Sequence, residues 1–328
     1  MANTEDLAKQ NILRESEDPD DFTPIKGYDF DQGVDYPKLI DSYMTTGFQA
    51  THLAKAIEII KQMRKENCTI YIGYTSNMIT SGLRDIFRYL AKHKLIDCIV
   101  TTAGGIEEDI IKCFKPFMLG EFEAKGAMLR EKGINRTGNI FVPNSRYCRF
   151  EEFTMPLMKK MLEEQKKTGH VITSSEFINK LGKEIDNPES IYYWTQKNNI
   201  PVFCPALTDG SLGDMIYFFK HNNPEFMIDI TDDIHKLNEF TMGAKKTGII
   251  ILGAGVVKHH ICNSNMFRNG ADYAVYINNA QEFDGSDAGA RPDEAVSWGK
   301  ILPDAKMIKV YGDATILFPL IVAKAFVD

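Results

Sequence analysis

The sequence has no apolar run long enough to cross a lipid bilayer, which takes about 18 or more consecutive apolar residues. Its most apolar stretch, GIIILGAGVV at 248–257, is short and interrupted by glycine. The opening segment, MANTEDLAKQ, has neither the basic region nor the apolar region of a secretory signal peptide. We therefore expect a cytoplasmic protein that does not bind membranes, with a buried strand at 248–257.

Closely spaced cysteines are also absent. The six cysteines stand at positions 68, 98, 113, 148, 204 and 262, so the closest two are fifteen residues apart. This spacing excludes a CxxC redox motif and the usual zinc-ligand patterns. We expect reduced thiols and no metal site.

The sequence lacks an excess of basic residues. Lys and Arg total 38 against 45 for Asp and Glu, which gives a net charge of -7. Nucleic-acid-binding domains carry a basic footprint, so we expect no nucleic-acid partner. The hydrophobic share of 44% is that of a globular protein, and it excludes a largely disordered chain.

Residues 1–21 differ from the rest of the chain, because they hold seven acidic residues, two basic residues and no aromatic residue. Such a composition favours a solvated tail. Leu7, Ile12 and Leu13 could still form the thin apolar edge of a short helix over 5–14. We expect residues 1–26 to be an acidic extension and residues 27–328 to form a single domain.

Helical and strand patterns alternate from residue 53 onward. Helices are predicted over 53–66, 78–93, 107–114, 150–166, 174–182, 189–198, 212–220, 232–245, 258–267 and 315–326. Strands are predicted over 68–74, 96–101, 139–142, 201–204, 227–230, 249–252, 273–277 and 307–310. This alternation predicts an α/β fold with a doubly wound, mostly parallel sheet and helices on both faces.

Six polar, turn-rich segments each follow a predicted strand. They are YTSN (74–77), TTAGG (101–105), ALTDGSLGD (206–214), GAGVVKHH (253–260), the loop 278–300 and GDAT (312–315). Ligands of open α/β sheets bind beyond the carboxyl ends of the strands, so we expect these segments to line one crevice for a large ligand.

A dinucleotide is one candidate for that crevice. Gly104 and Gly105 precede a predicted helix whose free N–H groups could hold a pyrophosphate. Gly253 and Gly255 offer a second such turn, but Lys258 occupies the third glycine position of GxGxxG, so the pattern alone leaves this interpretation open. Asp209 and Asp313 stand at strand ends, where each could accept ribose hydroxyls or cap a helix.

The loop at 278–300 is too long for an ordinary connection, which favours a functional role. It carries five carboxylates against two basic residues: Glu282, Asp284, Asp287, Asp293 and Glu294 against Arg291 and Lys300. It also holds Trp298, one of two tryptophans. Carboxylates with an indole face suit an alkylammonium ion and indicate a polyamine-like substrate. The alternative is a solvated acidic loop.

Lys300 has two interpretations. It is either a surface lysine paired with Asp293 or Glu294, or a nucleophile that forms an imine and therefore needs a lowered pKa. Of the adjacent His259 and His260, we expect only one to transfer protons.

Eight motifs resemble those of the deoxyhypusine synthase family, over residues 27–326. They are TTGFQAT (45–51), GYTSN (73–77), TTAGGIEEDIIK (101–112), NPESIYYW (187–194), LTDGSLGD (207–214), VVKHH (256–260), QEFDGSDAGARPDEA (281–295) and GARPDEAVSWGK (289–300). The resemblance implies a Rossmann-like domain that binds NAD and transfers the 4-aminobutyl group of spermidine. The implied acceptor is a lysine in the precursor of eukaryotic translation initiation factor 5A, reached through an imine on an enzyme lysine with release of 1,3-diaminopropane.

The resemblance also assigns roles to residues of this sequence. The nucleophilic lysine matches Lys300, and the active-site histidine matches His259. The expected NAD contacts are Ser76, Asn77, Met78, Ile79, Thr80, Thr102, Ala103, Gly104, Glu108, Asp209, Ala254, Asn279, Ala280, Asp313 and Ala314. The expected spermidine contacts are Glu107, Glu108, Asp214, His259, Asn263, Gly285, Ser286, Asp287, Glu294, Trp298 and Lys300.

The resemblance further implies a homotetramer of two tight dimers, with sites at each dimer interface. The family usually has GGG where this chain has Gly253-Ala254-Gly255. Two alternatives remain: a homospermidine synthase that uses putrescine as acceptor, and an NAD-binding regulatory paralogue. In relatives an N-terminal helix of a neighbouring chain can cover the site entrance, and residues 1–21 are a candidate for that role.

Overall fold

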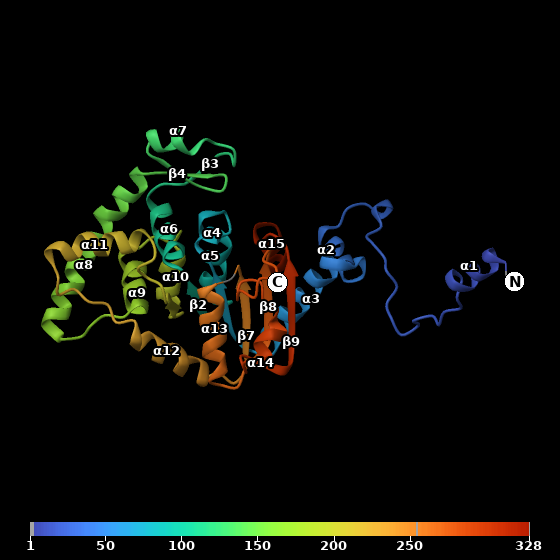
Figure 1. Ribbon diagram of the computed structural model, residues 1–328. Coiled ribbons are helices and arrows are strands. Elements are labelled where there is room, and N and C mark those ends of the chain that lie inside the picture. The colour runs from blue at the N-terminus through green and yellow to red at the C-terminus, as the bar shows by residue number, and fades with distance from the viewer. Residues whose placement is uncertain (1–2, 254, 328) are drawn as a thin grey trace.

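The central element of the fold is a parallel sheet. A computed structural model describes residues 3–253 and 255–327. Within them a six-stranded sheet has the order β6-β2-β1-β7-β8-β9, and every neighbouring pair is parallel (Figure 1). Its strands are β1 (Thr69–Tyr74), β2 (Cys98–Thr101), β6 (Val202–Phe203), β7 (Thr247–Leu252), β8 (Ala271–Asn278) and β9 (Ile301–Tyr311).

The strand order reverses between β1 and β7. The chain builds β1, β2 and β6 outward in one direction and then β7, β8 and β9 in the other. This is the Rossmann order, and its crevice opens at the point of reversal beyond the carboxyl ends of β1 and β7. The expectation of a doubly wound parallel α/β fold is therefore confirmed.

Helices cover both faces of the sheet. They are α1 (Thr4–Ile12), α2 (Tyr36–Thr46), α3 (Phe48–Lys65), α4 (Ser76–Thr80), α5 (Arg84–Lys92), α6 (Ala103–Phe114), α7 (Gly126–Glu131), α8 (Ser145–Thr168), α9 (Ser174–Ile185), α10 (Ile191–Asn198), α11 (Ser211–Asn222), α12 (Thr231–Met242), α13 (Val256–Met266), α14 (Pro292–Ser297) and α15 (Ala314–Ala325). One short 3₁₀ helix spans Phe30–Gln32. No helix among the described residues is both long and apolar enough to span a bilayer.

The continuous apolar run of β7 is explained by burial on both sides. Ile250 and Leu252 belong to the core that includes residues of α3, α5 and α15, whereas Ile249 and Ile251 belong to the core under α13. Successive side chains of a strand point to opposite faces, so a strand covered on both faces is apolar throughout. At Gly73 a Cβ atom would lie 2.6 Å from Ile261 Cδ1, so glycine lets α13 approach the sheet closely.

The segment between β2 and β6 was only partly predicted. It contains a small antiparallel sheet of β3 (Met118–Leu119), β5 (Ile140–Pro143) and β4 (Ile134–Thr137), of which only the strand at 139–142 was expected. The strand predicted at 227–230 is wrong. Only an isolated bridge from Thr173 to Asp229 forms there, and the Asp229 carboxylate instead accepts hydrogen bonds from Thr231 at the start of α12.

The helix predicted over 78–93 is two helices, α4 and α5, separated by a short connection. The amine of Lys112 on α6 donates to the carbonyls of Ile79, Thr80 and Ser81 at 2.5, 2.6 and 3.0 Å. These are the carbonyls that end α4, so a side chain distant in sequence satisfies them.

The acidic extension contains the short helix that was given as an alternative to a solvated tail, namely α1. All residues of α1 are exposed. Figure 1 shows α1 apart from the body of the molecule, joined to α2 by an extended stretch.

A buried ion pair joins α5, α6 and α10. Asp109 is fully buried and accepts hydrogen bonds from Arg84 Nε at 2.7 Å, Ser190 Oγ at 2.5 Å and the backbone N–H of Ile191. This carboxylate both pairs with the guanidinium and caps the first turn of α10.

We expect Asp109→Ala to lower the free energy of unfolding by about 3–5 kcal/mol, because it leaves the Arg84 charge buried without its partner. Urea unfolding would measure the loss. The matched control is Asp85→Ala, which removes an exposed carboxylate 3.9 Å from Arg88 and should change stability by less than about 0.5 kcal/mol. Equal effects of the two substitutions would contradict this account.

Candidate active site

Several of the predicted cofactor segments meet at the carboxyl edge of the sheet. The backbone N–H of Ser76 donates to Thr102 Oγ1 at 3.0 Å, which joins the segments after β1 and β2. A Cβ atom on Gly104 would lie 2.6 Å from Ser76 Cβ, and one on Gly253 would lie 2.9 Å from Thr75 Oγ1. The structure therefore brings 76–80, 102–104 and the turn at 253 together around the point where the strand order reverses.

The helix starts at this edge fit an anionic cofactor. Thr102 precedes α6 and Gly255 precedes α13, and neither residue makes a side-chain cap hydrogen bond. The start of α11 differs, because the backbone N–H of Leu212 donates to the Glu107 carboxylate. Uncapped N–H groups at a helix start are suited to hold a pyrophosphate. Asp313 differs, because its carboxylate accepts from the backbone N–H of Thr315 at 2.7 Å and so caps α15.

The remaining predicted cofactor residues are placed as follows. Asn279 and Ala280 directly follow β8, and Ala314 opens α15 after β9, at the same edge of the sheet. Asp209 precedes α11 and is exposed. The expected contact at Ala254 lies outside the described residues.

Carboxylates gather beside this crevice between α6 and α11. Glu107 is buried, and its Oε2 accepts from the backbone N–H of Leu212 at 2.7 Å. Burial raises the pKa of Glu107, and the nearby Asp214 and Asp209 raise it further. Burial also raises the pKa of Tyr147 to about 12, with the carboxylates of Glu108, Glu107 and Asp214 adding to the effect. A cluster of this charge favours a cationic ligand.

Glu108 is the most perturbed carboxyl group of the cluster. It accepts a hydrogen bond from Thr80 Oγ1. Burial, together with the nearby Glu107, raises its pKa to about 7, although the Thr80 hydroxyl and the Lys112 charge oppose the rise. Glu108 can therefore change its protonation state near neutral pH.

The predicted nucleophile lies in a second cluster. Lys300 is buried, and its Nζ lies 3.4 Å from His259 Nε2 and 5.5 Å from the centre of the Trp298 ring. The interpretation of Lys300 as a surface lysine is wrong, because its side chain is buried and forms no ion pair among the described residues. Arg291, the other basic residue of the loop 278–300, pairs with Glu282. His259 is thus the member of the histidine pair that contacts Lys300, and Asn263 follows it by one turn of α13.

Asp287 has an unpartnered carboxylate oxygen in this second cluster. Its Oδ2 is buried and has no hydrogen-bond partner among the described residues, while its backbone carbonyl is held by Lys258. Of the other predicted substrate residues, Gly285, Ser286, Glu294 and Trp298 are exposed. A buried carboxylate oxygen without a donor is suited to accept a hydrogen bond from an ammonium group of a ligand.

The two clusters lie apart within one chain. Lys300 precedes β9, and its carbonyl accepts from Ala271 at the start of β8, so it enters at the amino edge of the sheet. Glu107 and Glu108 follow β2 at the carboxyl edge, and β2 is three strand spacings of about 4.8 Å from β8. The backbone of the loop 278–300 thus crosses from one edge of the sheet to the other, while the Lys300 amine contacts His259 of the segment 253–260, one of the six.

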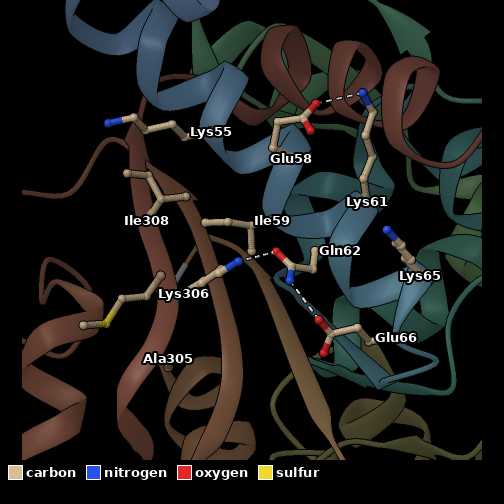
Figure 2. A pocket seen from close by; sticks show the side chains of 11 residues that line it. Lys55, Glu58, Ile59, Lys61, Gln62, Lys65, Glu66, Ala305, Lys306 and Ile308 are labelled. Atoms are coloured by element: carbon tan, nitrogen blue, oxygen red, sulfur yellow. Dashed lines mark hydrogen bonds and ion pairs between the residues drawn. The ribbon is translucent and has the colours of Figure 1, made fainter. Parts of the chain in front are cut away.

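A separate groove of about 870 Å³ lies between α3 and β9 (Figure 2). Its lining includes Lys55, Lys61, Lys65 and Lys306 and holds none of the predicted site residues. Lys61 pairs with Glu58, and Lys306 donates to Gln62.

We expect the unliganded protein to lose stability as the pH rises, through Glu108. A carboxyl group whose folded-state pKa is about 7 instead of 4.5 favours folding below pH 4.5, and this contribution is lost as the pH rises through 7. Glu108→Gln should remove up to about 3 kcal/mol of that pH dependence. Melting temperatures of both proteins should converge near pH 5 and separate toward pH 8, with the variant higher. Parallel pH profiles would contradict this assignment.

Comparison with known proteins assigns a family to this combination of fold and site. The family model for deoxyhypusine synthase matches residues 38–325. A deoxyhypusine synthase of Arabidopsis thaliana is 54% identical, over 92% of this chain and 89% of its own length. One of Caenorhabditis elegans is 49% identical, over 99% and 96%.

A solved structure supports the same family assignment. A crystal structure of an Entamoeba histolytica protein with the same family assignment superposes with a TM-score of 0.69 at 37% identity, covering 92% of this chain and 96% of the other.

Proposed function

The chain belongs to the deoxyhypusine synthase family of enzymes, and we propose that it transfers the 4-aminobutyl group of spermidine to one lysine of the precursor of eukaryotic translation initiation factor 5A. NAD is the proposed cofactor, and an imine on Lys300 is the proposed intermediate.

The observation that carries this proposal is the environment of the Lys300 amine. The amine is buried beside His259 and Trp298, and no carboxylate of the described residues pairs with it. An amine must be deprotonated to attack a carbon atom, and His259 Nε2 is the group placed beside this amine. The neighbouring histidine can accept the proton.

The proposed reaction balances over two transfers. NAD, if held by the segments 76–80 and 102–104, would supply the oxidant for the butyl carbon next to the secondary nitrogen of spermidine and, as NADH, the reductant for the final imine on the acceptor lysine. The Lys300 amine attacks the resulting C=N carbon, the C–N bond to the propyl part breaks, and 1,3-diaminopropane leaves with the proton. The acceptor lysine then displaces Lys300 in the same way. The unpartnered Oδ2 of Asp287 supports a role in holding an ammonium group of the substrate.

We further propose that two copies of the chain complete each site. The acidic cluster with Glu107 and Asp214 and the cluster with Lys300 lie apart in one chain, yet the reaction needs both. Each cluster has exposed aromatic neighbours: Tyr217 and Phe218 follow Asp214 on α11, and Trp298 and Phe283 stand near Lys300 in sequence with exposed fractions of 65% and 85%. Apolar surface of this kind is typical of an interface with another protein chain.

Lys300→Ala should abolish aminobutyl transfer and leave NAD binding unchanged, because the substitution removes the attacking amine and Lys300 is not among the expected NAD contacts. Borohydride trapping with labelled spermidine, followed by peptide mapping, should label Lys300 in the wild-type enzyme and nothing in the variant. Transfer by Lys300→Ala at the wild-type rate would refute the mechanism.

Complementation between two inactive variants tests the shared site. Suppose that one chain of a dimer supplies Lys300 to a site and the other chain supplies Asp214. When Lys300→Ala and Asp214→Ala are refolded together in equal amounts, half of the dimers are mixed, and each mixed dimer has one intact site out of two. The mixture should therefore recover about a quarter of wild-type activity. Two Lys300→Ala preparations refolded together serve as the control. No recovery in the mixture would argue that each chain forms a site by itself.

The acceptor is tested by supplying the precursor protein and putrescine separately. Transfer to the precursor protein supports the proposed function, whereas transfer to putrescine alone would indicate a homospermidine synthase. Activity that arises only after a second, different chain is added would indicate the regulatory role.

A further inference from the structure

Two buried lysines contact the substrate loop, which is defined here as residues 279–291. Lys258 on α13 is 2% exposed, and its Nζ donates to the backbone carbonyls of Asp287 at 2.5 Å and Ala290 at 2.9 Å. The same amine lies 4.7 Å from the centre of the Tyr276 ring.

Lys309 on β9 makes equivalent contacts from another element. It is 5% exposed, and its Nζ donates to the carbonyls of Ala280 at 2.8 Å and Gly289 at 2.5 Å. It lies 4.2 Å from the centre of the Tyr311 ring. Neither lysine forms an ion pair within 3–253 and 255–327, so loop carbonyls and aromatic faces compensate the buried amines. Burial lowers the pKa of both.

The contacts hold the loop at its two ends. Lys309 joins Ala280, at the start of the loop, to Gly289 near its end, and Lys258 takes the next carbonyl, that of Ala290. The loop also crosses itself closely, since a Cβ atom on Gly289 would overlap the Gln281 carbonyl oxygen. Asp287, whose carbonyl Lys258 holds, is the residue with the unpartnered carboxylate oxygen.

We propose that Lys258 and Lys309 are positioning residues that hold the substrate loop in the shape that presents the Asp287 carboxylate to an ammonium group of the substrate. The nature of the substrate rests on the proposed function; the fixing of the loop does not. The two lysines hold different parts of the substrate loop. Lys258 contacts only the part of the loop around Asp287, whereas Lys309 also holds Ala280, which adjoins the cofactor crevice.

The test uses Lys258→Met and Lys309→Met in the full-length, NAD-loaded enzyme. We expect Lys258→Met to raise the KM for spermidine roughly tenfold or more, with a smaller change in kcat and unchanged NAD affinity. Lys309→Met should raise both the KM for spermidine and the dissociation constant of NAD. A purely structural role would lower the melting temperature without this difference between the two variants.

Amide hydrogen exchange measures the loop itself without reference to activity. Both Met variants should increase exchange at 279–291 in the protein without spermidine. Lys220→Met is the matched control, because the Lys220 amine also donates to two carbonyls, those of Pro224 at 2.9 Å and Phe226 at 2.6 Å, outside the candidate site. It should leave the exchange of the loop and the KM for spermidine unchanged.

If the Met variants fail to fold, Lys258→Arg and Lys309→Arg replace them, since arginine keeps a charge and N–H donors at a different length. These variants should raise the KM for spermidine by a smaller factor. Unchanged exchange of the loop and unchanged KM in all folded variants would overturn the proposal. Faster exchange in the variants of an enzyme that transfers no aminobutyl group would support the fixed loop and refute the proposed function.

Discussion

A lysine amine that is removed from water needs other partners, and this fold meets that need in two ways. Lys112, Lys258 and Lys309 each donate to two or more backbone carbonyls. Lys300 instead faces the imidazole of His259 and the indole of Trp298. The same side chain therefore serves as a structural donor where carbonyl oxygens surround it, and it is suited to be a nucleophile where they do not.

The carbonyl-bound lysines also lie where the fold needs irregular backbone to be held. Lys112 ends α4, which carries the expected cofactor contacts, and Lys258 and Lys309 hold the substrate loop. Such segments cannot satisfy their carbonyls through a helix or sheet ladder, so a long side chain from a neighbouring element does so. Rigid elements of the fold thereby fix loops that would otherwise have several conformations.

The arrangement of the sheet accounts for the division of the site. The strand order reverses between β1 and β7, which places the crevice at the carboxyl edge. The loop 278–300 starts at that edge after β8, and its backbone ends at the amino edge, where Lys300 precedes β9. One chain therefore presents the acidic cluster after β2 and the amine beside His259 in different places, and the proposed second copy would unite them.

The periodicity of the sequence predicted the strands of the central sheet and the helices that pack on them, because a buried strand is a short apolar run and a packed helix has an apolar stripe. It did not predict α2, α7 or α14. It failed at 78–93, where the amine of the distant Lys112 ends α4 inside the predicted helix. It also failed at 227–230, where only an isolated bridge forms and the Asp229 carboxylate accepts from Thr231 at the start of α12. The acidic loop with Trp298 and Lys300 was recognisable from composition, but Lys258 and Lys309 were not, since lysines are usually exposed and nothing in their local pattern marks them as buried.

By itself the sequence determined the fold class, the family and the residue types of the site, because periodicity and motif content are local properties of the chain. Only the tertiary structure decided which lysine is bound to carbonyls and which stands beside a histidine, and that the amine and the acidic cluster lie apart. Those outcomes depend on the packing of α6, α13 and β9 against segments far away in the sequence, and on the end of the sheet at which each loop arrives.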